Sequence, residues 1–241
     1  MDFYVFGLML SSLLPIRPGE GPGVPKQLFG ATRYSRRLNK KEKEEFILTE
    51  DLKQILVGLM LGDLHGRNRN GNIRFVFKQG LIHETYLLSL YELFKNYCPS
   101  APKIVAALPH PKTGKIYSSI HFSTFTLPCF NEIYKLFYSS NVKLIPLNIG
   151  EFITPLSLAY WIADDGCWAK NNRHVVLCTD SFTLAEVNLL INVLNDKFNL
   201  KCYIYKQGNS HRIVIPSYSV PILQTLLAPI MPAMMKHKIG L

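Results

Sequence analysis

The sequence predicts an α+β fold built from two halves that use the same order of elements: helix, two strands, helix, two strands, helix. Two apolar stretches, residues 56–63 and 158–166, each contain an acid at or near their end, and about a hundred positions separate Asp63 from Asp165. Each stretch is followed by alternating apolar and polar residues and then by a run with helical periodicity. A unit that occurs twice in this way can complete its core by packing on its copy.

Small residues recur four positions apart in both stretches, which places them on one face of a helix. They are Gly58 and Gly62 in the first stretch and Ala159 and Ala163 in the second. Two such faces let the backbones of two helices approach closely. We therefore expect the two helices to form the interface between the halves, with their C-terminal ends side by side.

The acids at these ends are in an unfavourable position unless something compensates their charge. Each carboxylate faces the partial negative end of its own helix, and Asp63 and Asp165 also repel each other. A divalent cation shared by the two carboxylates removes both conflicts, and oxygen ligands of this kind favour Mg²⁺. The sequence therefore predicts a magnesium site where the two helices end.

The first half is expected to span residues 47–149. Thr49 fits the N-cap of a helix that ends at Asp63, and Asn70-Gly71 is a two-residue turn signal between two strands. Apolar residues that alternate up to position 77 indicate a strand with one buried face, on which a helix over residues 86–94 should pack. A second hairpin across residues 112–114 and a helix near residues 129–138 complete the half.

The second half, residues 150–241, is expected to repeat this order. After the helix that carries Asp165 we expect a strand pair around residues 171–178 and a helix over residues 184–198. A hairpin over residues 201–215 and a helix over residues 220–227 follow. The two antiparallel sheets should curve away from the helix pair as a saddle.

Residues 1–46 are expected to form an extension outside the two halves. The apolar run at residues 1–16 is too short to span a bilayer and lacks the basic start of a secretory signal. Residues 18–25 are dense in glycine and proline, which indicates a loop or disordered linker. The basic residues between positions 33 and 43 fit either an arm that binds nucleic acid or a solvated segment.

Composition restricts the class of partner and the compartment. The 241 residues carry a formal net charge of +10, which favours a polyanionic partner, with a merely basic surface as the alternative. The five cysteines show no C-x-x-C spacing and are odd in number, so neither a zinc site nor a complete disulfide framework is indicated. We expect reduced thiols in a reducing intracellular compartment and no membrane partner.

The two apolar stretches resemble the LAGLIDADG motif of homing endonucleases. The first copy has the sequence Leu-Val-Gly-Leu-Met-Leu-Gly-Asp-Leu, and the second has Leu-Ala-Tyr-Trp-Ile-Ala-Asp-Asp-Gly. The resemblance covers roughly residues 47–241, and the chain is particularly similar to single-chain, two-motif members of the yeast mitochondrial intron-encoded type. The first copy has Leu64 where the family most often has glycine, so we expect a different exit from that helix.

This resemblance implies a monomeric, site-specific double-strand DNA endonuclease of the mitochondrion. It implies that Asp63 and Asp165 hold the catalytic Mg²⁺, which Mn²⁺ can replace. Gly62 and Asp164, which directly precede these acids, are counted with the metal site. Asp164 lies about 100° round the helix from Asp165, so we expect it to support the ligands or to face DNA. Because the two halves differ, the double-stranded target should be long and non-palindromic.

The resemblance also implies one basic residue from each half beside the metal, where it polarises the attacking water or steadies the phosphate. Lys143 matches this position at the end of the first half. In the second half, residues 234–239 resemble the family's Met-x-Tyr-Lys pattern with His237 in place of the tyrosine. This match favours Lys238, and Lys236 is the alternative.

The polar faces of the expected strands carry side chains suited to contact with DNA. Arginine and lysine can bind guanine edges and asparagine can bind adenine, although most contacts in such complexes go to phosphates. The candidate DNA-contacting residues are Asn72, Arg74, Lys78, Lys115, Tyr117, His174, Tyr203, Tyr205 and Arg212.

Two other functions stay open at this stage. A maturase that assists intron splicing would share the fold and bind intron RNA, with or without cutting DNA. A non-cleaving DNA-binding protein of the same fold would not need an acid at the end of each buried helix. The presence of both acids favours cleavage but does not exclude a dual role.

Overall fold

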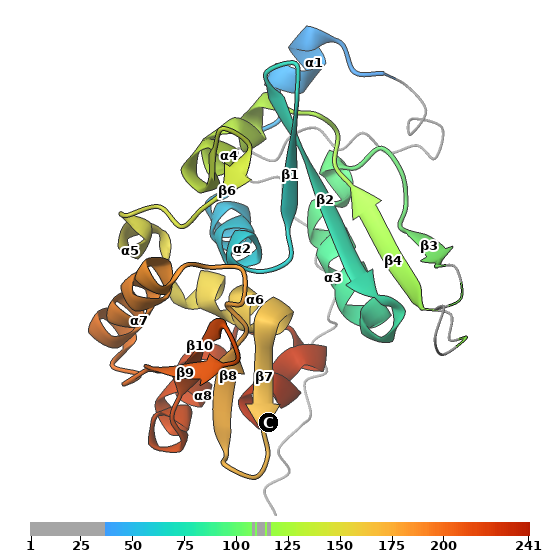
Figure 1. The fold of residues 1–241 in the computed structure, drawn as a ribbon. Coiled ribbons are helices and arrows are strands. Elements are labelled where there is room, and N and C mark those ends of the chain that lie inside the picture. Colours follow the sequence, from blue (N-terminus) through green and yellow to red (C-terminus); the bar gives the residue numbers. More distant parts are fainter. Residues whose placement is uncertain (1–36, 108, 110–113, 115–116) are drawn as a thin grey trace, which may run out of the picture.

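A computed structural model describes residues 37–107, 109, 114 and 117–241. Two halves with the same order of elements pack together through one helix from each (Figure 1). Helix α2 (Glu50–Leu61) opens the first half and helix α6 (Pro155–Asp165) opens the second. The predicted order of helix, two strands, helix, two strands and helix is confirmed in both halves.

The first half contains a four-stranded antiparallel sheet with the strand order β1-β2-β4-β3. Asn70 and Gly71, both at positive φ, form the predicted turn between β1 and β2. The predicted turn between β3 and β4 lies mostly outside the described residues. After α2, the main elements are β1 (His65–Arg69), β2 (Asn72–Gly80), α3 (Glu84–Phe94), β3 (Lys103–Ala106), β4 (Ser118–Ser123) and α4 (Asn131–Phe137).

The second half contains a matching sheet with the order β7-β8-β10-β9. Helices α7 and α8 have the predicted bounds. The strand pair expected around residues 171–178 begins earlier in the structure, because β7 starts directly after α6 without a connecting loop. After α6, the main elements are β7 (Gly166–Ala169), β8 (His174–Leu177), α7 (Leu184–Phe198), β9 (Tyr203–Gln207), β10 (Ser210–Ile215) and α8 (Val220–Leu227).

Several short elements were not predicted. Part of the expected extension packs on the first half, since Asn39 caps α1 and the ring of Phe46 lies 5.8 Å from that of Tyr97. Residues 1–36 lie outside the described part. The short elements are α1 (Lys40–Glu44), β5 (Tyr138–Ser139), β6 (Val142–Lys143), α5 (Ile149–Phe152) and the 3₁₀ helices η1 (Leu81–His83), η2 (Lys95–Tyr97), η3 (Pro128–Phe130), η4 (Ser217–Ser219) and η5 (Ala233–Ile239).

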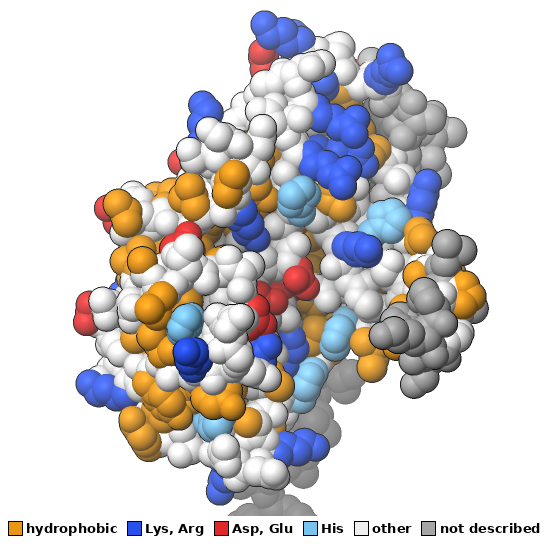
Figure 2. Space-filling view, viewed as in Figure 1, with side chains coloured by type: hydrophobic (Ala, Val, Ile, Leu, Met, Phe, Trp, Pro, Cys, Tyr) orange, Lys and Arg blue, Asp and Glu red, His pale blue; other side chains and the backbone are white. Residues whose placement is uncertain are grey.

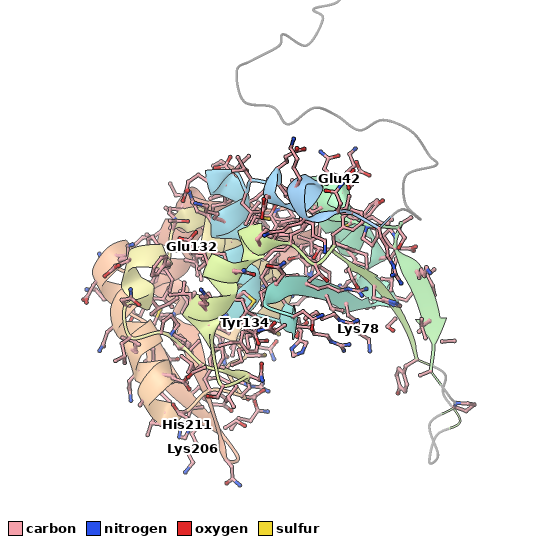
Figure 3. All side chains as sticks on the ribbon, turned by 90° about the horizontal axis from the view of Figure 1, so that it is seen from above. Glu42, Lys78, Glu132, Tyr134, Lys206 and His211 are labelled. Atoms are coloured by element: carbon pink, nitrogen blue, oxygen red, sulfur yellow. The ribbon has the colours of Figure 1, made fainter. Side chains whose placement is uncertain are left out.

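The helix pair is the centre of the hydrophobic core. Every residue of α2 from Ile55 to Leu61 is buried, and so is every residue of α6 from Ser157 to Ala163. Each sheet buries alternate residues on one face against helices and leaves its other face open, as the pattern in β2 shows. Figure 3 shows the two halves curving away from the helix pair, with Lys78 on the inner side of the curve.

None of the helices in the described residues combines the length and the apolar character that crossing a membrane requires.

Candidate functional site

The two motif helices approach closely where α2 carries glycine. A Cβ built on Gly58 would overlap the backbone carbonyl of Ser157, and one built on Gly62 would lie 2.6 Å from the Cβ of Asp164. A side chain at Gly58 would require a shift of one helix, and one at Gly62 would require the Asp164 side chain to move. The predicted close approach of the two backbones is therefore confirmed at Gly58, while Gly62 makes room for the side chain of Asp164.

The contribution of α6 to this seam differs in detail from the prediction. The atoms nearest to the two glycines belong to Ser157 and Asp164, not to Ala159 and Ala163. Both alanines are fully buried, so they still lie in the core. The spacing of small residues identified the correct helix but not the side chains that touch the glycines.

Asp165 lies at the end of its motif helix, as predicted, and Asp63 lies just beyond the end of the other. Helix α6 includes Asp165 as its last residue, whereas α2 ends at Leu61, two residues before Asp63. The expectation that the first helix reaches Asp63 was therefore wrong. The chain leaves the helix at Gly62, whose φ of −99° and ψ of −138° are not helical.

The exits from the two helices differ, as the substitution at Leu64 predicted. Leu64 is buried, and its N–H donates back to the carbonyl of Leu59 at 3.0 Å, which forms a turn before β1. In the second half Gly166 enters β7 at once. A Cβ on Gly166 would lie 2.5 Å from the carbonyl oxygen of Ile162, so this tight exit requires glycine.

One lysine from each half donates to the carbonyls at the end of its motif helix. The Nζ of Lys143, on β6, lies 2.8 Å from the carbonyl oxygen of Gly62 and 3.3 Å from that of Leu64. An ammonium group has three N–H donors. Two are therefore used on the helix end and one remains.

The Nζ of Lys238, on η5, makes similar contacts in the second half, and one of its two acceptors, the carbonyl of Asp164, matches that of Gly62. It lies 2.6 Å from the carbonyl oxygen of Ala163 and 2.8 Å from that of Asp164. Among the described residues, Lys236 makes no such side-chain contact with α6, so the geometry favours Lys238 over the alternative. The two lysines therefore occupy matched positions, although the sequence around them differs.

The carboxylate of Asp164 joins the second half to the first. Its Oδ1 accepts hydrogen bonds from the hydroxyl of Tyr86 at 2.9 Å and from the side-chain amide of Gln79 at 3.3 Å. Its Oδ2 accepts from the backbone N–H of Asp63 at 3.2 Å. The Gln79 amide also donates to Oδ2 of Asp63 at 3.3 Å. Asp164 thus helps to position Asp63 of the other half, through the Asp63 backbone N–H and through Gln79. The side chain of Asp164 points toward the first half, as expected for a residue about 100° round the helix from Asp165.

The site concentrates negative charge in a partly buried place. Burial, followed by the charge of Asp63, raises the pKa of Asp164 to about 8 and that of Asp165 to about 7. Burial also lowers the pKa of Lys143 and Lys238, and the nearby acids oppose that shift. With three acids and two lysines, the site carries one uncompensated negative charge when all five groups are ionised, which favours a cation.

Most of the expected DNA-contacting residues lie on the open faces of the sheets. Figure 2 shows acidic side chains near the centre of this view and basic side chains over the upper part of the first half. Tyr117 is exposed next to β4, Lys115 lies outside the described residues, and Arg212 pairs with Asp180. The others on the open faces are Asn72, Arg74, Lys78, His174, Tyr203 and Tyr205.

Several residues of the site and of the sheet faces were not predicted. Arg67 lies directly opposite Arg74, and this pairing could have been found from the two-residue turn at Asn70-Gly71. Gln79 and Tyr86 had no local signal, because their hydrogen bonds to Asp164 join residues 85 and 78 positions apart.

The molecule is an α+β protein in which two central helices pack between two antiparallel sheets. Each helix leads to an acid, and the two acids lie in one site that both halves form. Residues 53–223 match the model of the LAGLIDADG DNA endonuclease family. The chain belongs to this family, as the two motifs indicated.

Named relatives include both maturases and endonucleases. The chain is 36% identical over 200 residues to the cytochrome b mRNA maturase bI2 of Debaryomyces hansenii, covering 80% of this chain and 75% of the relative. It is 30% identical over 220 residues to a probable intron-encoded endonuclease 1 of Wickerhamomyces canadensis, covering 89% and 94%.

The fold is also similar to a solved structure, that of the homing endonuclease I-WcaI bound to its DNA recognition sequence. The two chains are 29% identical with a TM-score of 0.76, and the similarity covers 83% of this chain and 91% of I-WcaI.

Proposed function

We propose that the chain is a site-specific double-strand DNA endonuclease that hydrolyses phosphodiester bonds with a divalent metal held by Asp63 and Asp165. The observation that carries this proposal is the pairing at the helix ends, where each motif helix presents one acid and one bound lysine. Phosphodiester hydrolysis needs a positioned water, neutralised phosphoryl charge and a stabilised leaving oxygen. Two matched sets of groups suit the two strands of a duplex.

The acids fit Mg²⁺, with Mn²⁺ as a substitute. No described residue donates a hydrogen bond to the Asp165 carboxylate, and burial beside Asp63 raises its pKa, so this group lacks a partner. The carbonyls of Gly62 and Asp164 lie at the same helix ends. No three His, Cys, Asp or Glu side chains in the described part of the chain converge on one point. The remaining ligands would therefore be water and phosphate oxygens, which Mg²⁺ commonly keeps.

When bound, the metal would neutralise phosphate charge and favour ionisation of water. The protein's own contribution to the reaction would come from two lysines. Lys143 and Lys238 each have one N–H left after bonding to a helix end, and that donor can bind the scissile phosphate or the attacking water. A fixed donor of this kind needs no reorganisation during the reaction.

The open sheet faces would hold the duplex. Their side chains mix arginine and lysine with asparagine, histidine and tyrosine, and the net charge of +10 favours a polyanion. I-WcaI, which is similar over most of this chain, was solved with its recognition sequence. Because the two faces differ, the target would be non-palindromic, and one chain with two motifs would act as a monomer.

A second candidate function is supported by a different observation. The similarity to a cytochrome b mRNA maturase at 36% identity favours an additional or alternative role on intron RNA. Both roles would place the protein in the mitochondrion, where a yeast-type intron-encoded protein of this resemblance acts. A DNA-binding protein of the same fold that does not cut would leave the paired acids without a use.

Cleavage of a randomised duplex library with Mg²⁺, followed by sequencing of the cut ends, tests the proposal. We expect a single preferred site and no cleavage after chelation of the metal. Specific binding without cleavage would support the non-cleaving protein instead. Binding to intron RNA, with no preference among duplexes, would support the maturase.

A further inference from the structure

The open faces of the two sheets carry different kinds of side chain. The open face of the first sheet holds the basic residues Arg67, Arg69, Arg74, Lys78 and Lys103 together with His121. None of the strands β1 to β4 contains an acid. The face is therefore positive along its length, and Figure 2 shows basic side chains gathered over this part of the molecule.

Two of these arginines form a pair with no carboxylate between them. Arg67 and Arg74 are direct cross-strand neighbours on β1 and β2, a position in which like charges destabilise a sheet. With Arg69 and His121 they line a hollow of about 250 Å³. The Nε of Arg74 is buried with no hydrogen-bond partner among the described residues. Among the described residues, neither arginine of the pair has a carboxylate partner, and this uncompensated charge favours a ligand rich in acceptors.

The open face of the second sheet is nearly uncharged. Cys167 is exposed and pairs across the strands with the half-buried Val176. Tyr203 and Tyr205 are 48% and 51% exposed on the edge strand β9, which β10 separates from β8. These side chains offer apolar surface and only a few polar tips.

The arginine on this second face is already paired. Nε and Nη2 of Arg212 donate to the two carboxylate oxygens of Asp180 at 2.9 Å and 2.7 Å. This bidentate pair uses two of the five N–H donors of the guanidinium and compensates its charge. The charge of Arg212 is therefore compensated by a carboxylate, whereas Arg67 and Arg74 have no carboxylate partner among the described residues.

We propose that the two sheets recognise their half-sites by different chemistry: Arg67 and Arg74 bind guanine in one half, and Val176 with Cys167 contacts thymine methyl groups in the other. Guanine presents O6 and N7 as paired acceptors in the major groove, where arginine binds both, while the thymine methyl is the apolar feature of that groove. This proposal rests on the proposed function, because it concerns the same DNA site.

Base analogues test it in a duplex that is selected from a randomised library by binding, without a divalent cation. Replacing guanine by 7-deazaguanine removes only the N7 acceptor, and replacing thymidine by deoxyuridine removes only the methyl group. Arg74→Gln should relax base preference in one half, which identifies that half as the one bound by the first sheet. Affinities are then measured with each analogue placed in one half at a time.

We expect 7-deazaguanine in the first half-site to weaken binding about tenfold at one or two positions. Deoxyuridine in the second half-site should weaken binding about fourfold for each methyl contacted. 7-Deazaguanine in the second half-site and deoxyuridine in the first should have little effect on affinity. Equal sensitivity of both halves to each analogue, or insensitivity to both, would overturn the proposal.

Matched variants connect the analogues to the side chains. Arg67→Gln or Arg74→Gln should abolish the effect of 7-deazaguanine and leave that of deoxyuridine, and Val176→Ser should do the reverse. Lys78→Gln is the control for a phosphate contact: it should weaken all duplexes alike and lower the salt slope by about one. If the arginine variants behave like Lys78→Gln, these arginines bind only phosphate and the proposal is wrong.

Binding is measured without a divalent cation, so the result does not depend on cleavage. A chain that shows the expected analogue pattern but never cuts DNA would contradict the proposed endonuclease and support the division between the sheets. A chain with no preferred duplex would contradict both.

Discussion

The two halves of the molecule are alike at the helix ends and unlike on the sheet faces. At the helix ends each half supplies one acid and one lysine, and both lysines donate to two backbone carbonyls. On the faces, the first sheet is basic without any acid in its strands, whereas Arg212 of the second is neutralised by Asp180. Under the proposed function, cleavage of two chemically equivalent DNA strands requires the same acid and lysine from each half. Recognition of two different half-sites does not require the two sheet faces to be alike.

The likeness is not complete even at the centre. Asp164 is held by Tyr86 and Gln79 of the first half, while glycine, Gly62, occupies the matched position in the first motif. One half therefore supports the other, and the halves are not exchangeable around the acids.

The largest expected effect tests whether both acids are needed. Asp63→Asn and Asp165→Asn should each reduce cleavage about a thousandfold or more, because an amide binds a divalent cation poorly and leaves the phosphate charge uncompensated. DNA affinity without metal should be nearly unchanged, since the sheet faces hold the duplex. Full cleavage by either variant with Mg²⁺ would remove that acid from the site.

The next largest effect is expected for the loss of a site lysine, and Lys236, two residues from Lys238, provides the control. Lys238→Ala should lower the cleavage rate by about a hundredfold to a thousandfold, the usual cost of losing one fixed donor at a reacting phosphate or carbonyl. Lys236→Ala should leave the rate unchanged, because its side chain does not contact α6. Single-turnover rates decide between them, and the opposite ranking would show that the C-terminal register has been assigned incorrectly.

The seam between the halves should be more sensitive than the sheets to a single methyl group. Gly58→Ala should cost about 1 to 3 kcal/mol of unfolding free energy, since its Cβ would overlap the Ser157 carbonyl. Gly80→Ala is the matched control, because the nearest atom to its Cβ would be 3.9 Å away. Denaturant unfolding measures both, and equal stability of the two variants would contradict the close approach of the helices.

A smaller effect concerns pH. Because burial raises the pKa of Asp164 and Asp165 to about 8 and about 7, the folded state binds these protons more tightly than the unfolded state. Their contribution to stability should therefore fall as the pH rises from about 4 to about 8. Mg²⁺ should restore part of the loss, and Asp165→Asn should flatten the profile. Melting temperatures of the metal-free protein that rise steadily over this range in wild type and variant alike would contradict the charge conflict.

Local patterns in the sequence were sufficient for most of the fold. The bounds of α7 and α8 follow from helical periodicity, and the β1–β2 hairpin follows from Asn70-Gly71. The end of α2 was missed because Gly62 leaves the helix under the constraint of the nearby Asp164 side chain, which is a contact between halves. The early start of β7 depends on the tight exit from α6 at Gly166. The alternation of apolar and polar residues, from which the strands were predicted, does not show this exit.

The candidate site was predictable only where a motif marked it. The motif resemblance named Asp63, Asp165 and Lys143, which the structure brings to the ends of the motif helices, and it left Lys238 beside Lys236 until the geometry favoured Lys238. Gln79 and Tyr86 are ordinary strand and helix residues whose role arises from packing between distant segments. Contacts between distant segments leave no periodic pattern in the sequence, unlike helices and strands, so only the structure shows them.

The most direct test of the account is to measure the cleavage of each strand separately, on the preferred duplex with a different label on each strand. Because each lysine lies at its own helix end, Lys143→Ala should slow mainly one strand and Lys238→Ala mainly the other, so that each variant accumulates a nick in the opposite strand. If both variants slow the same strand, or slow both strands equally, the two lysines do not each serve one strand of the duplex, and the account of the site is wrong.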